Sequence, residues 1–224
     1  MKYIITGTSS GLGYWLSKKL ISYGEVVGVS RSLGLADKLH QSGQFSHLKF
    51  DFSESIDENC FNTLINDLKI FINNQPFAIV LNAGCFYSGI YRLTEKKLME
   101  LFHVNIFSII KLIQALEKPF LRRVFIVNSI SGIIGQSHQH EYSASKHAVM
   151  GFARSLAKSA KNLDYDVMCI NPGGMKTELW KNYLESDTSD FLMPEVMANI
   201  CVSLILIPQR AFIAQMIILP PSDL

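Results

Sequence analysis

Residues 2–13 read KYIITGTSSGLG, an apolar run followed by a turn with three glycines. The apolar run predicts a buried strand, and the glycines predict a tight turn into a helix. Gly7 allows the turn, Gly11 lets backbone approach a pyrophosphate, and Gly13 lets the helix pack close to the sheet. The first N–H groups of that helix would then face the phosphate. A strand, a glycine-rich turn and a helix in this order predict a dinucleotide-binding α/β fold.

Strand and helix patterns alternate along the rest of the chain. Further strands are expected at 26–30, 47–50, 77–81, 124–128, 167–171 and 214–219. Helices are expected at 12–23, 35–41, 57–73, 95–120, 140–163 and 194–206. The strands are nearly continuous apolar runs, as in parallel sheets covered on both faces. The predicted fold class is therefore α/β: a Rossmann-like, doubly wound parallel sheet of about seven strands with helices on both faces. No linker or repeat interrupts residues 1–224, which predicts a single domain.

The composition excludes several classes of partner. A formal net charge of +2 is too small to indicate a nucleic acid or an anionic membrane as partner. The first strand begins almost at Met1, which leaves no room for a targeting peptide, and no apolar stretch approaches the roughly 18 residues that span a bilayer. The expected compartment is the cytoplasm. The four cysteines have no paired spacing and are expected to be reduced: Cys60, Cys85, Cys169 and Cys201.

Tyr142 and Lys146 stand four residues apart in a predicted helix, so their side chains share one face. A lysine ammonium at that position favours the phenolate and should lower the pKa of the tyrosine from its usual ~10. Ser129 lies thirteen residues upstream and could bind a carbonyl oxygen if the fold brings it alongside. The spacing alone is common on solvated helices, so its meaning depends on the other motifs.

The end of the second predicted strand indicates the cofactor. An acidic residue there would bind the ribose hydroxyls of NAD. Instead, Ser30 removes the repulsion and Arg31 can bind a 2′-phosphate through two parallel hydrogen bonds. This predicts NADP(H) over NAD(H), and the alternative is an unpaired surface arginine. Asp51, just past the third strand, could meet the adenine amino group or cap the next helix.

These motifs together resemble the short-chain dehydrogenase/reductase family over essentially the whole chain. The landmarks beyond the glycine turn are Asn82-Ala83-Gly84, Asn105, Ser129, Tyr142 with Lys146, Asn171-Pro172-Gly173 and Thr177. The resemblance implies an oxidoreductase that transfers hydride between NADP(H) and the carbonyl or alcohol carbon of a small molecule.

The resemblance also implies a role for each landmark. Tyr142 would be the general acid in reduction and the base in oxidation, while Lys146 would lower its pKa and hold the nicotinamide ribose. Ser129 would orient the substrate carbonyl, and Asn105 would bend its helix and anchor a water for proton relay. No metal is expected. The residues expected to bind the cofactor are Gly7, Ser9, Ser10, Gly11, Leu12, Gly13, Ser30, Arg31, Asp51, Asn82, Ala83, Gly84, Tyr142, Lys146, Pro172, Gly173, Met175 and Thr177.

Some positions depart from the family pattern. Ser10 stands where NADP-preferring members often carry a basic residue, so the phosphate argument depends on Arg31. The substrate lid is expected at about 176–206, and its first part is shorter than in most members. Trp180 and Tyr183 in this lid, and Cys85 and Phe86 after the Asn-Ala-Gly motif, are candidates for substrate contacts, with plain packing as the alternative.

Two other functions stay open. A 3-oxoacyl-[acyl-carrier-protein] reductase would need a basic docking surface, for which Arg122-Arg123 is a poor basis. A regulatory protein that binds NADP(H) without turnover would usually lack the tyrosine or the lysine. Relatives commonly pair their long helices, so a homodimer or homotetramer is expected.

Overall fold

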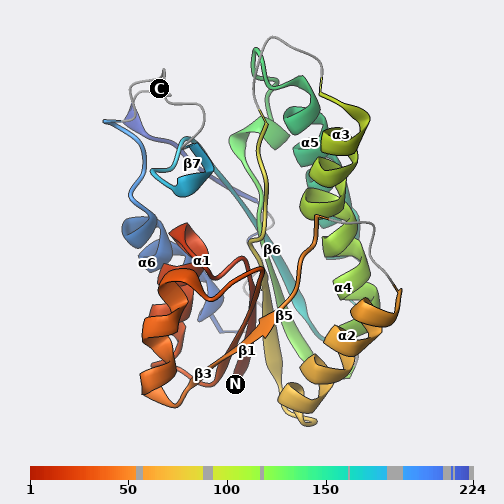
Figure 1. Cartoon of the computed structure of the whole chain (residues 1–224), viewed down its shortest axis with the longest axis vertical. Helices are drawn as coiled ribbons and strands as arrows, with labels where there is room; N and C mark the ends of the chain where they lie inside the picture. The colour runs from red at the N-terminus through yellow and green to blue at the C-terminus, as the bar shows by residue number, and fades with distance from the viewer. Residues whose placement is uncertain are drawn as a thin grey trace.

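The computed structural model describes residues 1–53, 58–87, 93–116, 119–160, 162–180, 189–208, 213 and 215–221. Its strands form one sheet of order β3-β2-β1-β4-β5-β6-β7, and every neighbouring pair is parallel. The strands are β1 (Lys2–Thr6), β2 (Val26–Ser30), β3 (Phe45–Lys49), β4 (Phe77–Leu81), β5 (Leu121–Val127), β6 (Asp166–Pro172) and β7 (Met216–Ile218). The predicted Rossmann-like, doubly wound α/β sheet is confirmed (Figure 1).

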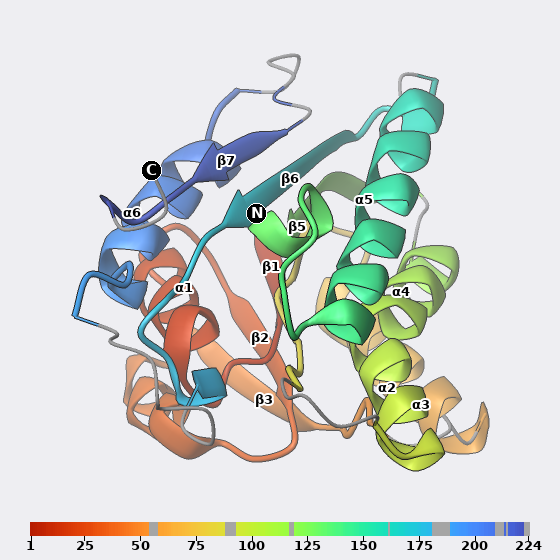
Figure 2. The ribbon, with the colours of Figure 1, turned by 90° about the horizontal axis from the view of Figure 1, so that it is seen from above.

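Helices cover both faces of this sheet (Figure 2). The α-helices are α1 (Gly11–Leu20), α2 (Glu58–Ile72), α3 (Glu95–Phe102), α4 (Ser108–Leu116), α5 (His140–Ala160) and α6 (Pro194–Ile205). Short 3₁₀ helices are η1 (Gly34–Ser42), η3 (Ile130–Gly132) and η4 (Glu178–Trp180), and a π-helical turn, η2 (His103–Phe107), joins α3 to α4. Helices α1 and α6 lie on one face, and α2 to α5 lie on the other (Figure 1).

The strand sequences explain why both faces are covered. β1, β2 and β4 are buried at every position. Successive side chains point to opposite faces, so Ile4 packs with α2, α4 and α5, while Tyr3 and Ile5 pack with α1 and α6. A continuous apolar run therefore supplies two hydrophobic cores at once.

The long helix predicted at 95–120 is continuous over Glu95–Leu116 and includes the π-helical turn. Its mean hydropathy of 1.4 over a membrane-length window makes it long and apolar enough to cross a bilayer. The expectation that no stretch approaches that length was therefore wrong. Its buried side chains pack into the hydrophobic clusters described here, and these contacts account for its apolar character: Leu101, Val104, Ile106, Ile109, Leu112, Ile113 and Leu116.

The site follows from the strand order. β1 lies between β2 and β4, so the chain runs outward in opposite directions on the two sides of β1. Ligands of doubly wound sheets bind beyond the carboxyl ends of the strands at such a reversal. The loops that leave β1, β4, β5 and β6 meet at this edge.

Candidate active site

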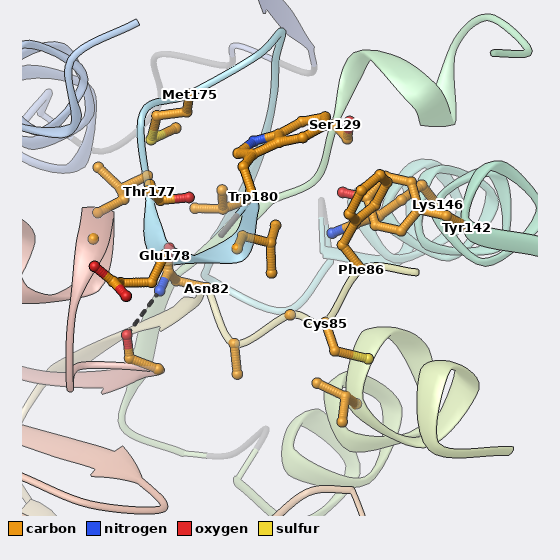
Figure 3. A pocket seen from close by; sticks show the side chains of 18 of the residues that line it. Asn82, Cys85, Phe86, Ser129, Tyr142, Lys146, Met175, Thr177, Glu178 and Trp180 are labelled. Atoms are coloured by element: carbon orange, nitrogen blue, oxygen red, sulfur yellow. Dashed lines mark hydrogen bonds between the residues drawn. The ribbon is translucent and has the colours of Figure 1, made fainter. Parts of the chain in front are cut away.

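A cavity of about 730 Å³ opens at the carboxyl edge of the sheet (Figure 3). The predicted cofactor-binding residues line it with one exception, Gly13. Of the four predicted catalytic residues, Ser129, Tyr142 and Lys146 line the cavity, and Asn105 lies behind its wall. The fold thus gathers residues from opposite ends of the chain into one site.

The glycine turn after β1 is held against the loop that leaves β4. Gly7 has a φ of +75°, and a Cβ there would lie 2.9 Å from the Cα of Ala83. A Cβ on Gly13 would fall on the carbonyl oxygen of Gly7, so this glycine shapes the turn from behind instead of lining the cavity. The Nδ2 of Asn82 donates to the carbonyls of Thr6 and Gly7 at 3.0 and 3.2 Å. Asn82 therefore fixes the turn's shape.

The start of α1 fits a phosphate group. Ser10 occupies the N-cap position without a side-chain capping bond, and the first turn contains no acidic residue. The first N–H groups of the helix therefore remain available, together with the positive end of its dipole. Gly11 has a φ of +55°, and a Cβ there would lie 3.2 Å from the methyl of Thr177. The glycine leaves room for a diphosphate between α1 and the loop after β6.

The end of β2 carries a hydrogen-bonded cluster that the sequence did not reveal. The buried Ser30 hydroxyl donates to the carbonyl of Ser32 at 2.8 Å and lies 2.9 Å from Nε2 of His47 and 3.3 Å from Oγ1 of Thr8. Burial lowers the pKa of His47, so its imidazole is neutral at pH 7. His47 faces Ser30 only because of the register between β2 and β3, which no local pattern reports. Arg31 is exposed and lines the cavity.

Asp51 also lines this end of the cavity. Its Oδ1 accepts a hydrogen bond from the backbone N–H of Ser53 at 2.8 Å, which stabilises the turn after β3. The second oxygen of the carboxylate leaves Asp51 able to contact a ligand as well.

Ser129, Tyr142 and Lys146 meet where η3 faces the first turns of α5. Tyr142 and Lys146 are only 7% and 5% exposed. The Nζ of Lys146 lies 5.7 Å from the centre of the Tyr142 ring. Ser129 caps η3 by accepting a hydrogen bond from the N–H of Ser131 at 3.1 Å, and its hydroxyl lies close enough to Tyr142 to lower the pKa of the phenol. The predicted trio is therefore brought together.

The pKa of Tyr142 departs from the sequence-based expectation. Burial raises it to about 12, and the hydrogen bond from Ser129 opposes this rise only in part. Burial also lowers the pKa of Lys146 to about 8. The expectation that Lys146 brings the tyrosine pKa below its usual value was wrong for the protein alone, because burial of the phenol is the largest influence on that pKa and raises it.

Asn105 lies in the π-helical turn η2 and is fully buried. Its Oδ1 accepts from the N–H of Cys85 at 2.9 Å, and its Nδ2 donates to the carbonyl of Cys85 at 3.0 Å. The same Nδ2 lies 3.0 Å from the Ser145 hydroxyl on α5. Asn105 thus joins the long helix, the loop after β4 and the helix of Tyr142.

Aromatic rings continue from Tyr142 across the cavity. Phe86 packs edge-on against Tyr142, and Trp180 packs on Phe86 (Figure 3). Phe191 in turn packs edge-on against Trp180. Phe86 and Trp180 were candidates from the sequence, whereas Phe191 was missed, as were Gln136 and Gln139 in the loop before α5. Loop residues of this kind carry no periodic signal. Tyr183 lies outside the described residues.

The segment predicted as a lid divides into two parts. Met175 and Leu192 form an isolated parallel bridge, with hydrogen bonds of 3.0 Å from Lys176 N to Leu192 O and 2.9 Å from Leu192 N to Gly174 O. The second part, α6, packs on α1 and in the hydrophobic core. Within the predicted lid, α6 therefore belongs to the core, and residues 181–188 lie outside the described part of the chain. Among the described residues, no group of three potential ligands could hold a metal ion.

Comparison with known proteins supports an enzyme family. A family model described as short chain dehydrogenase matches residues 2–188. An uncharacterized oxidoreductase, YusZ of Bacillus subtilis, is 27% identical over 191 residues, covering 82% of this chain and 68% of the relative. The 3-oxoacyl-[acyl-carrier-protein] reductase FabG of Chlamydia muridarum is 24% identical over 203 residues, covering 84% and 79%.

Solved structures share the fold. A 4-hydroxyisoleucine dehydrogenase complexed with NADH superposes with a TM-score of 0.84 at 20% identity, covering 98% of this chain and 97% of the other. A variant of actinorhodin polyketide ketoreductase with NADPH gives 0.83 at 21% identity, covering 96% and 94%. The matched residues 2–188 include the glycine turn, Ser129, Tyr142 and Lys146, and the chain belongs to the short-chain dehydrogenase/reductase family of oxidoreductases.

Proposed function

We propose that the protein is an NADPH-dependent oxidoreductase that reduces a ketone or aldehyde and, in the reverse direction, oxidises the alcohol. The observation that carries the proposal is the meeting of Ser129, Tyr142 and Lys146 in the same cavity as the glycine turn. A serine and a protonated tyrosine side by side suit the binding and protonation of a carbonyl oxygen.

Within this proposal, NADP(H) is favoured over NAD(H) by the end of β2. Ser30 places no negative charge at that position, and Arg31 lines the cavity beside it. A guanidinium can bind a 2′-phosphate through paired hydrogen bonds. The structural neighbours support a nicotinamide cofactor in general, because their structures contain NADH in one case and NADPH in another.

The chain's own residues would act as follows. When bound, the nicotinamide supplies the hydride. Tyr142, with a pKa near 12, is protonated at pH 7 and holds a proton at its hydroxyl for the substrate oxygen. Ser129 offers a second hydroxyl to that oxygen, which would orient the carbonyl and stabilise its developing charge. Lys146, with a pKa near 8, is mostly charged at pH 7 and would hold the ribose while favouring proton release from Tyr142.

A screen of NADPH oxidation with diverse ketones, aldehydes, quinones and acyl compounds tests the proposal. Tyr142→Phe should lower turnover by roughly 10²–10⁴-fold while NADPH binding persists. Near wild-type turnover by this variant would exclude Tyr142 as the acid. Arg31→Ala should raise KM for NADPH but not for NADH, and a wild-type preference for NADH would contradict the cofactor assignment.

A 3-oxoacyl-[acyl-carrier-protein] reductase is the second candidate, because FabG relatives match most of the chain. Arg122-Arg123 offers no docking surface: Arg123 is buried against Asp166 at 2.7 Å, and Arg122 lies 4.0 Å from Asp164. Turnover of acyl-carrier-protein substrates without turnover of free ketones would favour this candidate. NADPH binding without turnover across the whole panel would favour a regulatory role.

The assembly and location are also proposals. Phe107 and Met99 on the long helix are exposed and apolar, which suits a homodimer or homotetramer formed through these helices. Light scattering that gives a monomer mass would contradict this. We propose a cytoplasmic location, which agrees with the four free cysteines, and cell fractionation tests it.

A further inference from the structure

We propose that Phe86 determines substrate specificity: with Trp180 it forms an aromatic wall beside Tyr142 that favours uncharged carbonyl compounds bearing a planar, apolar substituent. The inference rests on the proposed carbonyl reduction and concerns which carbonyl is reduced. Neither residue has a part in the proton transfer itself.

The ring contacts place this wall directly against the reacting side chain. The Phe86 and Tyr142 rings are 4.8 Å apart at 89°, and the Phe86 and Trp180 rings are 4.7 Å apart at 47°. Both separations lie within the range in which aromatic pairs attract each other. Phe86 is 5% exposed, so these contacts hold its ring in place.

This wall is separate from the two cores of the sheet. Phe86, Leu101 and Tyr142 form a third hydrophobic cluster, and Trp180 packs against it from the lid. Phe86 and Trp180 also line the cavity. Phe86 is therefore buried by side chains around Tyr142, and its phenyl ring forms part of the cavity surface that a ligand would contact.

The position of the carbonyl then fixes what Phe86 contacts. A carbonyl oxygen that reaches the hydroxyls of Ser129 and Tyr142 places its substituents among the neighbours of Tyr142. Phe86 and Trp180 are those neighbours on the lid side of the cavity (Figure 3). Flat rings stack on a flat substituent, whereas a saturated ring of the same size contacts them only through hydrogen atoms.

The charges of the cavity wall argue against a negatively charged substituent. Among the described residues of the cavity wall, the cationic side chains are Arg31 and Lys146. Both are accounted for by the proposed cofactor. The charged groups that remain in the described wall are the carboxylates of Asp51, Glu100 and Glu178, which carry no positive charge. A substituent carrying a carboxylate or phosphate would find no counter-charge among these residues.

Acetophenone and cyclohexyl methyl ketone make a matched pair of substrates, since they share a carbon skeleton and differ in the planarity of one ring. The ratio of their kcat/KM values is measured with NADPH for wild type and for Phe86→Leu. Conjugation with the phenyl ring changes the intrinsic reactivity of acetophenone. The inference is therefore tested by how the ratio of the two kcat/KM values changes from wild type to Phe86→Leu. We expect Phe86→Leu to lower the acetophenone preference by roughly threefold to tenfold, the range given by the loss of one aromatic contact.

Phe107→Leu is the control. Phe107 is 39% exposed on the long helix and does not line the cavity, so its loss should leave the ratio unchanged. If Phe86→Leu slows both substrates equally, Phe86 only braces Tyr142 and the inference is overturned. If wild type turns over no carbonyl at all, the proposed function fails, and this inference fails with it. If wild type reduces carbonyls but Phe86→Leu leaves the ratio unchanged, only this inference fails.

If Phe86→Leu does not fold, a binding measurement on a protein that retains Phe86 tests the inference instead. The chain has two tryptophans, so Trp15→Phe leaves Trp180 as its sole indole fluorophore. With NADP⁺ present, acetophenone should quench the Trp180 emission in a saturable way. Its half-saturating concentration should be lower than the one for the emission change caused by cyclohexyl methyl ketone. Equal half-saturation for the two ketones, or no saturable change, would overturn the aromatic wall.

Discussion

Asn105 closes a pair of hydrogen bonds on the backbone of Cys85, accepting from its N–H at 2.9 Å and donating to its carbonyl at 3.0 Å. Cys85 lies between Gly84, which lines the cavity, and Phe86, which packs on Tyr142. One amide on the long helix therefore positions the loop that contributes to both the cofactor end and the substrate end of the site.

Asn105→Leu should destabilise the protein by about 2 kcal/mol or more, because it leaves buried backbone groups of Cys85 without partners. Turnover should fall as well, since the loop carrying Phe86 loosens. Ser145→Ala is the comparison, because it removes the hydroxyl's bonds with Asn105 and with the Tyr142 carbonyl but keeps both bonds of Asn105 to Cys85. Urea unfolding of both variants measures the difference. Equal stabilities of Asn105→Leu and wild type would contradict the bracing role.

Lys146→Met should make the cofactor-free protein more stable at pH 7 while abolishing activity. Burial lowers the pKa of Lys146 from 10.5 to about 8 in the folded state. A difference of this size corresponds to a penalty of about 3 kcal/mol, present in full below pH 8. Between pH 8 and 10.5 the unfolded chain binds more protons than the folded one, so the stability of wild type rises with pH relative to the variant.

Unfolding free energies of wild type and Lys146→Met at several pH values from 7 to 10.5 test this. The gap in favour of Lys146→Met should be largest below pH 8 and should close toward pH 10.5. Lys158→Met, at the exposed end of the same helix, controls for replacing a lysine. A gap that widens with pH would show that the ammonium is not penalised by burial.

Arg123→Met should destabilise the fold by about 3–5 kcal/mol, the usual cost of leaving a buried charge without its partner. Arg123 is 4% exposed, pairs with Asp166 at 2.7 Å, and donates to the carbonyls of Leu204 and Ile207 at the end of α6. The neighbouring variant Arg122→Met removes a 4.0 Å pair with an exposed partner and two hydrogen bonds to the nearby carbonyls of Pro119 and Leu121, and should cost under about 1 kcal/mol because Asp164 stays solvated. Thermal or urea unfolding of both variants measures the two losses of stability. Similar losses for Arg122→Met and Arg123→Met would contradict the structural role assigned to Arg123.

Gly13→Ala should destabilise the protein by roughly 1–3 kcal/mol and weaken NADPH binding, because the new methyl group falls on the Gly7 carbonyl and displaces the turn. Gly151→Ala is the matched control. Its Cβ would meet nothing within 4 Å on α5, so this change should stabilise the helix by about 0.5–1 kcal/mol. Unfolding curves and NADPH titration report both effects, and unaltered binding by Gly13→Ala would refute the close packing.

The sequence predicted most of the fold because the buried strands are apolar on both faces. β1, β2 and β4 begin and end where their apolar runs do. β5 begins three residues earlier than predicted, at Leu121, because Arg122 and Arg123 hid the start of the strand. The partner that allows Arg123 to be buried, Asp166, lies on the next strand of the sheet and 43 residues away along the chain.

The parts of the site that depend on a local sequence motif could be predicted, whereas the parts that depend on tertiary packing could not. The glycine turn and the Tyr142–Lys146 spacing are local, so both were found. The contact of His47 with Ser30 depends on strand register, and the high pKa of Tyr142 depends on burial by distant segments. The edge-on contact of Phe191 with Trp180 is a tertiary contact, which no pattern in residues 178–193 specifies.

The bridge between Met175 and Leu192 holds together the two ends of the segment proposed as a lid. Residues between such anchors can be lengthened, shortened or replaced at a small entropic cost, about 0.6 kcal/mol for each doubling of the loop. Neither β6 nor α6 would need to move. We therefore expect that the segment between these anchors, proposed as the substrate lid, can be exchanged as a unit. Grafting the corresponding segment of another family member would test whether it sets the substrate range.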